Sequence, residues 1–310
     1  MVFLRSFGSY VPSRVVTNSE LAERLGCEAG WILDVSGISE RRYASENESV
    51  VDLATAAARD CLDRASVDPA SIGLVILASG SAERRFPGPA AETAARLGMA
   101  GVPVIDLPMA SAGALFGLAM AHRLCTAFGP VLLIAAEKMS AVIAREPQDR
   151  NTAILFGDGA GACLIHPGEG PAQIVDACLH TDGSFAENLR LDWDQPLHMD
   201  GRSVIMQASR KVPAVIRELL ERNQRSAESI DTFLLHQANQ NLTSRIAKSL
   251  EVPLEKFYSN IAKYGNTSSA SMLIAAAEWS ASSGFRPSQV IVFAAFGAGF
   301  NWGALLAVGA

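Results

Sequence analysis

The chain has no long apolar run, and that absence removes the membrane proteins from consideration. No apolar stretch reaches the roughly 18 residues that a membrane-spanning helix needs. The first residues, 1–5, do not show the charged region, apolar stretch and cleavage site of a secretory signal. We therefore expect a cytoplasmic protein.

Cysteine is also scarce, and its positions do not form a metal or redox motif. No two cysteines have the two-residue spacing that zinc sites and dithiol sites use. An odd, widely spaced set is typical of reduced thiols that pack like small apolar side chains. The five cysteines are Cys27, Cys61, Cys125, Cys163 and Cys178. We expect neither disulfides nor a bound metal ion.

Positive charge is in deficit. The 26 Lys and Arg residues are outnumbered by 32 Asp and Glu residues, and the net charge of −6 excludes the basic surface of a nucleic-acid binder. The partner is better explained as a small substrate, or as a substrate linked to an acyl carrier, than as a nucleic acid. The 310 residues, 49% hydrophobic and 19% charged, are enough for one large or two ordinary domains with a substantial core.

One pattern of helix and strand occurs twice in the chain. Residues 49–65 have the apolar spacing of a helix, and after a turn they lead to the apolar strand Leu74–Leu77. Residues 204–223 have the same helical spacing and lead to the strand Thr232–Leu235. The two stretches therefore predict one α/β unit that is repeated.

The spacing between equivalent positions supports the repeat. Three pairs lie 158, 158 and 159 residues apart, and they are Ile72 with Ile230, Ser111 with Ser269, and Val131 with Val290. A near-constant offset favours duplication, because independent loops would drift in length. We expect an α/β fold of two halves, residues 1–166 and 167–310, with mixed, largely parallel sheets covered by helices.

Ser111 is a candidate nucleophile. It follows the predicted strand 102–107 and lies in the run 110–119, which we expect to form a helix whose first turn is almost all small residues. A nucleophile there would gain from the positive end of the helix dipole and from free N–H groups. The alternative is a close-packed helix with a serine cap.

Two further polar residues stand where ligands gather in α/β proteins. His236 follows the strand 233–235, and Asn266 lies in a turn before a helix rich in small residues. Each also has a purely structural interpretation, as a packed histidine and as a helix cap. The glycine-rich runs 157–161 and 296–300 do not have the spacing of a phosphate or dinucleotide loop and are better explained by tight turns.

Taken in order, these segments resemble the 3-oxoacyl-ACP synthase III family of the thiolase superfamily, over essentially the whole chain. The strongest matches are His236–Asn239, Gly265–Ser268, Phe156–Gly161 and Phe296–Gly303, supported by Gly8–Pro12 and by Trp31 ahead of Gly37–Arg41. The resemblance implies a thiolase fold with αβαβα layers, in which residues 1–166 carry the nucleophile and residues 167–310 carry His236 and Asn266.

The resemblance also implies roles at the reaction centre. The position of Ser111 takes the acyl group, and His236 and Asn266 hold the malonyl thioester carbonyl as carbon dioxide leaves. The backbone N–H groups of Ser111 and Ala298 form the oxyanion hole.

Further roles concern substrates and partners. Trp31 and Arg150 flank the adenine of coenzyme A, Asn239 and Gly201 belong to the substrate site, and Phe86 closes the acyl pocket of the partner subunit. The implied protein is a homodimer that uses acyl-CoA as a substrate, works with an acyl carrier protein and needs no cofactor.

The sequence departs from the family pattern at four positions. Ser111 replaces a cysteine, and a hydroxyl, unlike a thiol, needs a base such as His236 to remove its proton. Val35 replaces an arginine for the coenzyme A phosphates, and Met206 and Asn241 replace basic residues for carrier docking. Nearby basic residues that can rebuild a docking patch are Arg210, Lys211, Arg245 and Lys248.

The function we expect is the priming condensation of fatty acid or polyketide synthesis, in which a short acyl group on Ser111 is joined to malonyl-ACP. Three alternatives remain open at this stage. One is an acyltransferase or hydrolase without decarboxylation, against which the retained Asn266 counts. The second is an engineered cysteine-to-serine variant that traps a normal synthase, and the third is a non-catalytic partner subunit.

Overall fold

The computed structural model describes all 310 residues and has thirteen strands and eleven α-helices. The strands are β1 (Val2–Tyr10), β2 (Arg14–Thr17), β3 (Glu40–Tyr43), β4 (Leu74–Ala78), β5 (Val104–Leu107), β6 (Val131–Lys138), β7 (Asp158–Pro167), β8 (Ala172–Thr181), β9 (Leu189–Arg190), β10 (His198–Met199), β11 (Thr232–Leu235), β12 (Val290–Gly297) and β13 (Asn301–Gly309). The helices are α1 (Asn18–Leu25), α2 (Ala29–Ser36), α3 (Val50–Ala65), α4 (Pro89–Arg96), α5 (Gly113–Phe128), α6 (Met139–Ile143), α7 (Arg150–Ala153), α8 (Gly201–Arg222), α9 (Gln240–Leu250), α10 (Ile261–Tyr264) and α11 (Ser271–Ser283).

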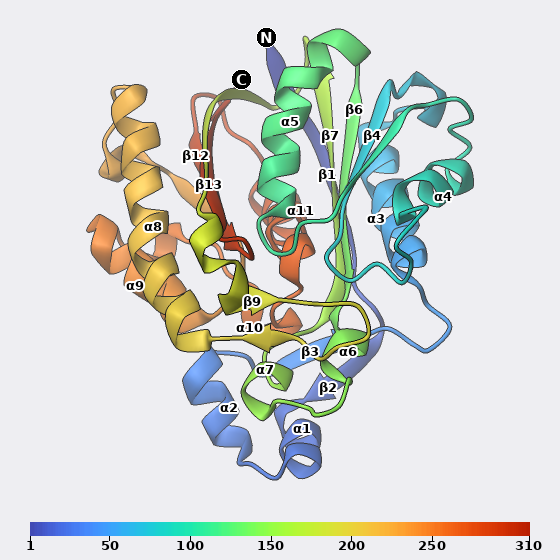
Figure 1. Ribbon diagram of the computed structural model, residues 1–310. Helices are drawn as coiled ribbons and strands as arrows, with labels where there is room; N and C mark the ends of the chain where they lie inside the picture. The colour runs from blue at the N-terminus through green and yellow to red at the C-terminus, as the bar shows by residue number, and fades with distance from the viewer.

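The main sheet is built from two groups of strands. The strand order is β11-β12-β13-β8-β1-β7-β6-β4-β5, so that the strands before residue 168 lie on one side and those after it on the other. Only two residue pairs, Phe3 with Gln173 and Leu4 with Ala172, join the groups through β1 and β8. The helices α5 and α11 lie between the two groups, α3 and α4 cover the first group from outside, and α8 and α9 cover the second (Figure 1). The expected αβαβα fold is confirmed. The expectation of largely parallel strands was wrong, because only β11–β12, β4–β5 and β4–β6 pair in parallel, while strands joined by a short turn, such as β12 and β13, run antiparallel.

The apolar pattern explains this layering. Strands β4, β6 and β12 are buried along nearly their whole length, which is typical of strands covered on both faces. Helix α11 is apolar on all sides and is buried from Ser271 to Ala277, as a helix between two sheets must be. Helix α8 instead buries one face, which includes Ala208, Val212 and Ile216.

The repeated elements form where the pattern places them. Helix α3 begins after Ser49, whose side chain forms a capping box with Asp52, and its partner in the second half is α8. The strands after these helices are β4 and β11, within one residue of the predicted ends. Residues 168–171 connect β7 to β8, and the division of the chain into residues 1–166 and 167–310 stays a prediction.

The helix expected from residue 110 begins later, and this prediction was wrong in detail. Helix α5 starts at Gly113 after Ala112, so Ser111 lies in the turn before the helix. The backbone of Ser111 has a φ of 60°, which is uncommon outside glycine and costs about 1–3 kcal/mol. A tight turn, closed by the Ala112 N–H and the Ala110 carbonyl at 2.6 Å, imposes this conformation.

All five cysteines are free thiols, as expected, and four of them are buried. Burial raises the pKa of the Cys61 thiol to about 12 and that of Cys125 to about 11, so both are held as neutral thiols. Among the helices, none combines the length and the apolar composition needed to cross a membrane.

Candidate active site

Ser111 is held at the junction of the two halves. Its backbone N–H donates to the Ser268 hydroxyl oxygen at 3.0 Å, and its side chain is buried. Gly297, at the end of β12, packs directly against this turn. A Cβ at Gly297 would lie 2.4 Å from the Ala110 carbonyl oxygen and 2.9 Å from Ser111 Cβ, so only glycine fits there.

His236 directly follows β11, at the carboxyl end of that strand. Its backbone N–H donates to the Ala294 carbonyl, which continues the parallel pairing of β11 with β12. Its ring is buried, and this burial lowers the pKa of the imidazole to about 4. At neutral pH the side chain is therefore an uncharged imidazole, with Nδ1 2.6 Å from the Ser271 hydroxyl.

Asn266 is fixed by hydrogen bonds on both its backbone and its side chain. Its backbone N–H donates to the Leu155 carbonyl at 2.9 Å, and its carbonyl accepts from the Gly157 N–H at 3.1 Å. The side-chain oxygen accepts from the Ser268 N–H at 2.9 Å. The amide NH₂ is therefore the free end of this side chain and can act as a donor to a ligand.

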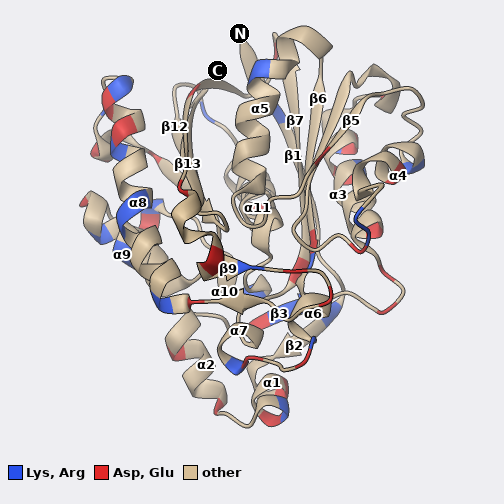
Figure 2. Ribbon diagram, viewed as in Figure 1, with Lys and Arg blue, Asp and Glu red and all other residues tan.

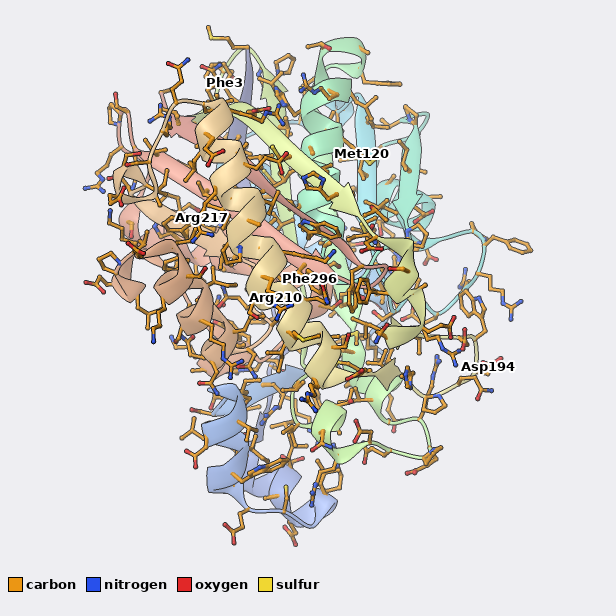
Figure 3. All side chains as sticks on the ribbon, turned by 60° about the vertical axis from the view of Figure 1, so that its left-hand side comes forward. Phe3, Met120, Asp194, Arg210, Arg217 and Phe296 are labelled. Atoms are coloured by element: carbon orange, nitrogen blue, oxygen red, sulfur yellow. The ribbon has the colours of Figure 1, made fainter.

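The three residues line one cleft. Thirteen of its 18 lining residues are hydrophobic, and they come mainly from α8, α9 and the ends of β11 and β12. Figure 3 shows Phe296 at the end of β12 beside α8, the helix that carries Arg210. The cleft lies at the carboxyl ends of parallel strands, where α/β proteins bind ligands. A mainly apolar cleft with a hydroxyl, an imidazole and an amide suits an acyl thioester.

Ser268 contacts both sides of this site, a role that was not predicted from the sequence. Its hydroxyl accepts from the Ser111 N–H, and its own N–H orients the Asn266 side chain. Ser268 also has a positive φ of 48°, so its backbone is constrained like that of Ser111. The run of hydroxyl residues from Thr267 to Ser271 was the available signal.

Glu137 holds the segment that carries Ser268 and Asn266 through buried hydrogen bonds. It is the second-to-last residue of β6, is fully buried, and accepts hydrogen bonds from the hydroxyls of Ser81 and Ser269, both at 2.6 Å. The Gly80 N–H donates to it at 3.0 Å. Burial raises the pKa of the Glu137 carboxyl, while these donors act to lower it. The contact through Ser269 ties the first half to the segment that carries Ser268 and Asn266.

Trp31 and Arg150 contact each other, and their role on either side of coenzyme A stays a prediction. Arg150 begins α7, Trp31 lies on α2, and the guanidinium carbon is 5.2 Å from the centre of the Trp31 ring. Asn239 is also near α2, because its amide donates to the Val35 carbonyl at 2.9 Å while its oxygen caps α9. Asn239 therefore has a clear structural role at this position.

None of the remaining predicted site residues lines the cleft. Gly201 begins α8 between the lining residues Met199 and Val204, and a Cβ there would meet no neighbouring atom. Ala298 follows β12, next to the lining residue Gly297. Phe86 is 86% exposed in the loop between β4 and α4 and does not reach the cleft of its own chain.

The predicted carrier-docking residues lie on the outer helices. Lys and Arg residues follow α8 and α9, as Figure 2 shows, and Arg210, Arg245 and Lys248 are exposed. Lys211 is not free, because its Nζ pairs with Asp182 at 3.2 Å and lies 3.8 Å from the centre of the Trp302 ring.

Comparisons with known proteins agree with this geometry. Models of 3-oxoacyl-[acyl-carrier-protein] synthase III and of its C-terminal part match residues 105–183 and 220–308. β-Ketoacyl-[acyl-carrier-protein] synthase III 1 of Vibrio parahaemolyticus is 35% identical over 308 residues, which cover 96% of each chain.

Two solved structures show the same similarity in three dimensions. The 3-oxoacyl-[acyl-carrier-protein] synthase III of Aquifex aeolicus has a TM-score of 0.95 and 34% identity, over 99% of this chain and 100% of that one. The priming β-ketosynthase of the R1128 polyketide pathway has a TM-score of 0.92 and 30% identity, over 100% of this chain and 96% of that one.

Proposed function

Because the chain belongs to the 3-oxoacyl-[acyl-carrier-protein] synthase III family, a family of acyltransferase-type condensing enzymes, we propose that it primes fatty acid or polyketide chains from Ser111. It would load a short acyl group from acyl-CoA on this serine and condense it with malonyl-ACP. The observation that carries the proposal is the meeting of Ser111, His236 and Asn266, from three distant segments, in one apolar cleft.

In the acylation step, the Ser111 oxygen attacks the thioester carbonyl and the carbon–sulfur bond breaks. The coenzyme A thiol leaves with the proton lost by the hydroxyl. The developing oxyanion would be stabilised by the N–H groups of Ser111 and Ala298. Since the Ser111 N–H donates to Ser268 in the free protein, the oxyanion must share this donor with the Ser268 hydroxyl or replace it.

In the condensation step, the bond between the malonyl carboxylate and its α-carbon breaks and carbon dioxide leaves. The negative charge moves to the thioester oxygen, which His236 and Asn266 would hold by hydrogen bonds. The α-carbon then attacks the acyl ester, the bond from the acyl carbon to the Ser111 oxygen breaks, and this oxygen takes up a proton from water. The positioned amide of Asn266 supports this reaction over simple acyl transfer, which has no need of a second donor site.

Two features of the surface support the proposed partners. For the proposed homodimer, the strongly exposed Phe86 is available to contact a partner subunit. Strand β5 lies at one edge of the sheet, and its unpaired backbone groups can pair with a second copy. The proposed acidic carrier protein has the exposed side chains of Arg210, Arg245 and Lys248 as a docking patch.

We expect the protein to release carbon dioxide and form a 3-oxoacyl-ACP when it is supplied with a short acyl-CoA and malonyl-ACP. Mass spectrometry of the carrier protein and capture of labelled carbon dioxide would measure the two products together. Reactions without acyl-CoA serve as the control. Transfer of the acyl group to water or to another acceptor, with no carbon dioxide released, would instead support a hydrolase or acyltransferase.

If coenzyme A enters between Trp31 and Arg150, alanine at either position should raise KM for the acyl donor more than it lowers kcat, because both residues act on binding. The change at Trp31 should be the larger, since its ring provides most of the stacking area. Steady-state kinetics with varied acyl-CoA would measure this, with Arg145→Ala as a control, because the Arg145 guanidinium instead donates to the Gln195 carbonyl. Unchanged KM in both variants would exclude this entrance.

A further inference from the structure

The Ser271 hydroxyl makes two hydrogen-bond contacts, and together they determine where its proton lies. The Gln237 backbone N–H donates to Ser271 Oγ at 3.0 Å. This oxygen is also 2.6 Å from Nδ1 of His236. A serine hydroxyl has one proton to donate, and the structure offers Ser271 no acceptor other than this ring nitrogen.

The surroundings hold this pair in place. Ser271 is the first residue of α11 and is only 2% exposed. The peptide at Gln237 is fixed as well, because the Gln237 side chain donates to the carbonyls of Leu235 and Tyr258. The hydroxyl therefore accepts from a rigid N–H on one side and faces the imidazole on the other.

We infer that Ser271 is a positioning residue that holds His236 in the tautomer with its proton on Nε2. If the hydroxyl donates to Nδ1, this nitrogen is an acceptor, and a neutral imidazole then carries its only proton on Nε2. Nε2 has no hydrogen-bond partner in the protein, and His236 lines the cleft. His236 thus presents an N–H donor to the substrate, as the condensation step requires.

The same tautomer removes His236 as the base that activates Ser111. With Nε2 protonated and Nδ1 occupied, the ring has no free lone pair for the serine proton. Acylation then takes a different route, in which the proton of the Ser111 hydroxyl passes to the departing thiolate sulfur as the carbon–sulfur bond breaks. This division of roles rests on the function proposed above, whereas the tautomer itself does not.

Nitrogen NMR of protein with ¹⁵N-labelled histidine tests the tautomer without substrate. We expect the His236 signals to show a protonated Nε2 and an unprotonated Nδ1, with His236→Gln providing the assignment among the five histidines. In Ser271→Ala, the ring loses its donor at Nδ1, and the signals should move toward a mixture of tautomers. A protonated Nδ1 in the unaltered protein would overturn the inference.

Half-reaction kinetics give a second, independent test. Ser271→Ala should slow decarboxylation of malonyl-ACP by about 10- to 100-fold, the size of effect known for groups that orient metal-bound histidines, and should leave acylation of Ser111 unchanged. Ser271→Thr, which retains the hydroxyl, should keep most of the activity. Ser280→Ala is the matched control, because Ser280 lies on the same helix and bonds only the Ala277 carbonyl.

The outcomes separate this inference from the proposed function. Equal loss of both half-reactions in Ser271→Ala, with circular dichroism showing a folded protein, would mean that Ser271 supports the whole site and does not select a tautomer. If the unaltered protein neither acylates nor releases carbon dioxide, the proposed function fails, while the NMR result still decides the state of His236.

Discussion

Replacing Asn266 with alanine is expected to abolish release of carbon dioxide from malonyl-ACP while acylation of Ser111 continues nearly unchanged. The Asn266 oxygen is occupied by the Ser268 N–H, so the lost group is a donor that is already aimed. Removal of one such donor to a developing oxyanion reduces rates by about 10²- to 10³-fold. Trapping of labelled carbon dioxide and mass analysis of the acyl-protein would measure the two half-reactions separately.

Asn223→Ala provides the matched control for this experiment. Asn223 is also a hydrogen-bonded asparagine, but its amide donates to Asp176 and to the Leu219 carbonyl at the far end of α8. Neither half-reaction should change in this variant. If Asn266→Ala instead slowed acylation as much as decarboxylation, one shared site for transfer or hydrolysis would explain the protein better.

The second large effect concerns Ser111. Incubation with short acyl-CoA should add one acyl mass to the peptide that contains Ser111, and Ser111→Ala should remove this adduct completely. The adduct should be labile to alkali but resist neutral hydroxylamine, as an oxygen ester does. Ser111→Cys should acylate faster than the unaltered protein, because a thiol ionises far more readily than a hydroxyl at a helix N-terminus.

The peptides of the unaltered protein also provide an internal control for this experiment. Ser269, at the equivalent position of the second half, is buried and bonded to Glu137, so its peptide should stay unmodified. An absence of any adduct on Ser111 across acetyl, propionyl and longer donors, in a folded protein, would remove the serine nucleophile and favour a silent subunit or a trapped variant.

Much of the fold could be predicted because its signals are local and repeated. Helix α3, strand β4 and strand β11 each have an apolar period within a single stretch of sequence, and the offset of 158 residues relates the two halves. His236 and Asn266 could be identified because each stands at the end of an element in a recognisable motif. The basis for joining them in one site was the family resemblance, since no periodicity relates residues 111, 236 and 266.

The supporting residues could not be predicted, because their roles depend on contacts across the chain. Glu137 looks like the polar end of an apolar strand, yet its carboxylate meets Ser269, 132 residues away. Ser271 similarly looks like a small helix residue, and only the fold places its hydroxyl against His236. The turn conformation of Ser111 depends on close contact with Gly297, which no local propensity describes.

The buried carboxyl group of Glu137 also gives the two serines at equivalent positions of the repeat different surroundings. In the repeat, β6 corresponds to β12, so the position of Glu137 in one copy is that of Phe296 in the other. Ser111 therefore lines an apolar cleft, whereas the hydroxyl of Ser269 donates to the Glu137 carboxyl group and is fully buried. One residue near the end of a strand thus leaves one serine open to a ligand in the cleft, while the equivalent serine joins the two halves through a hydrogen bond.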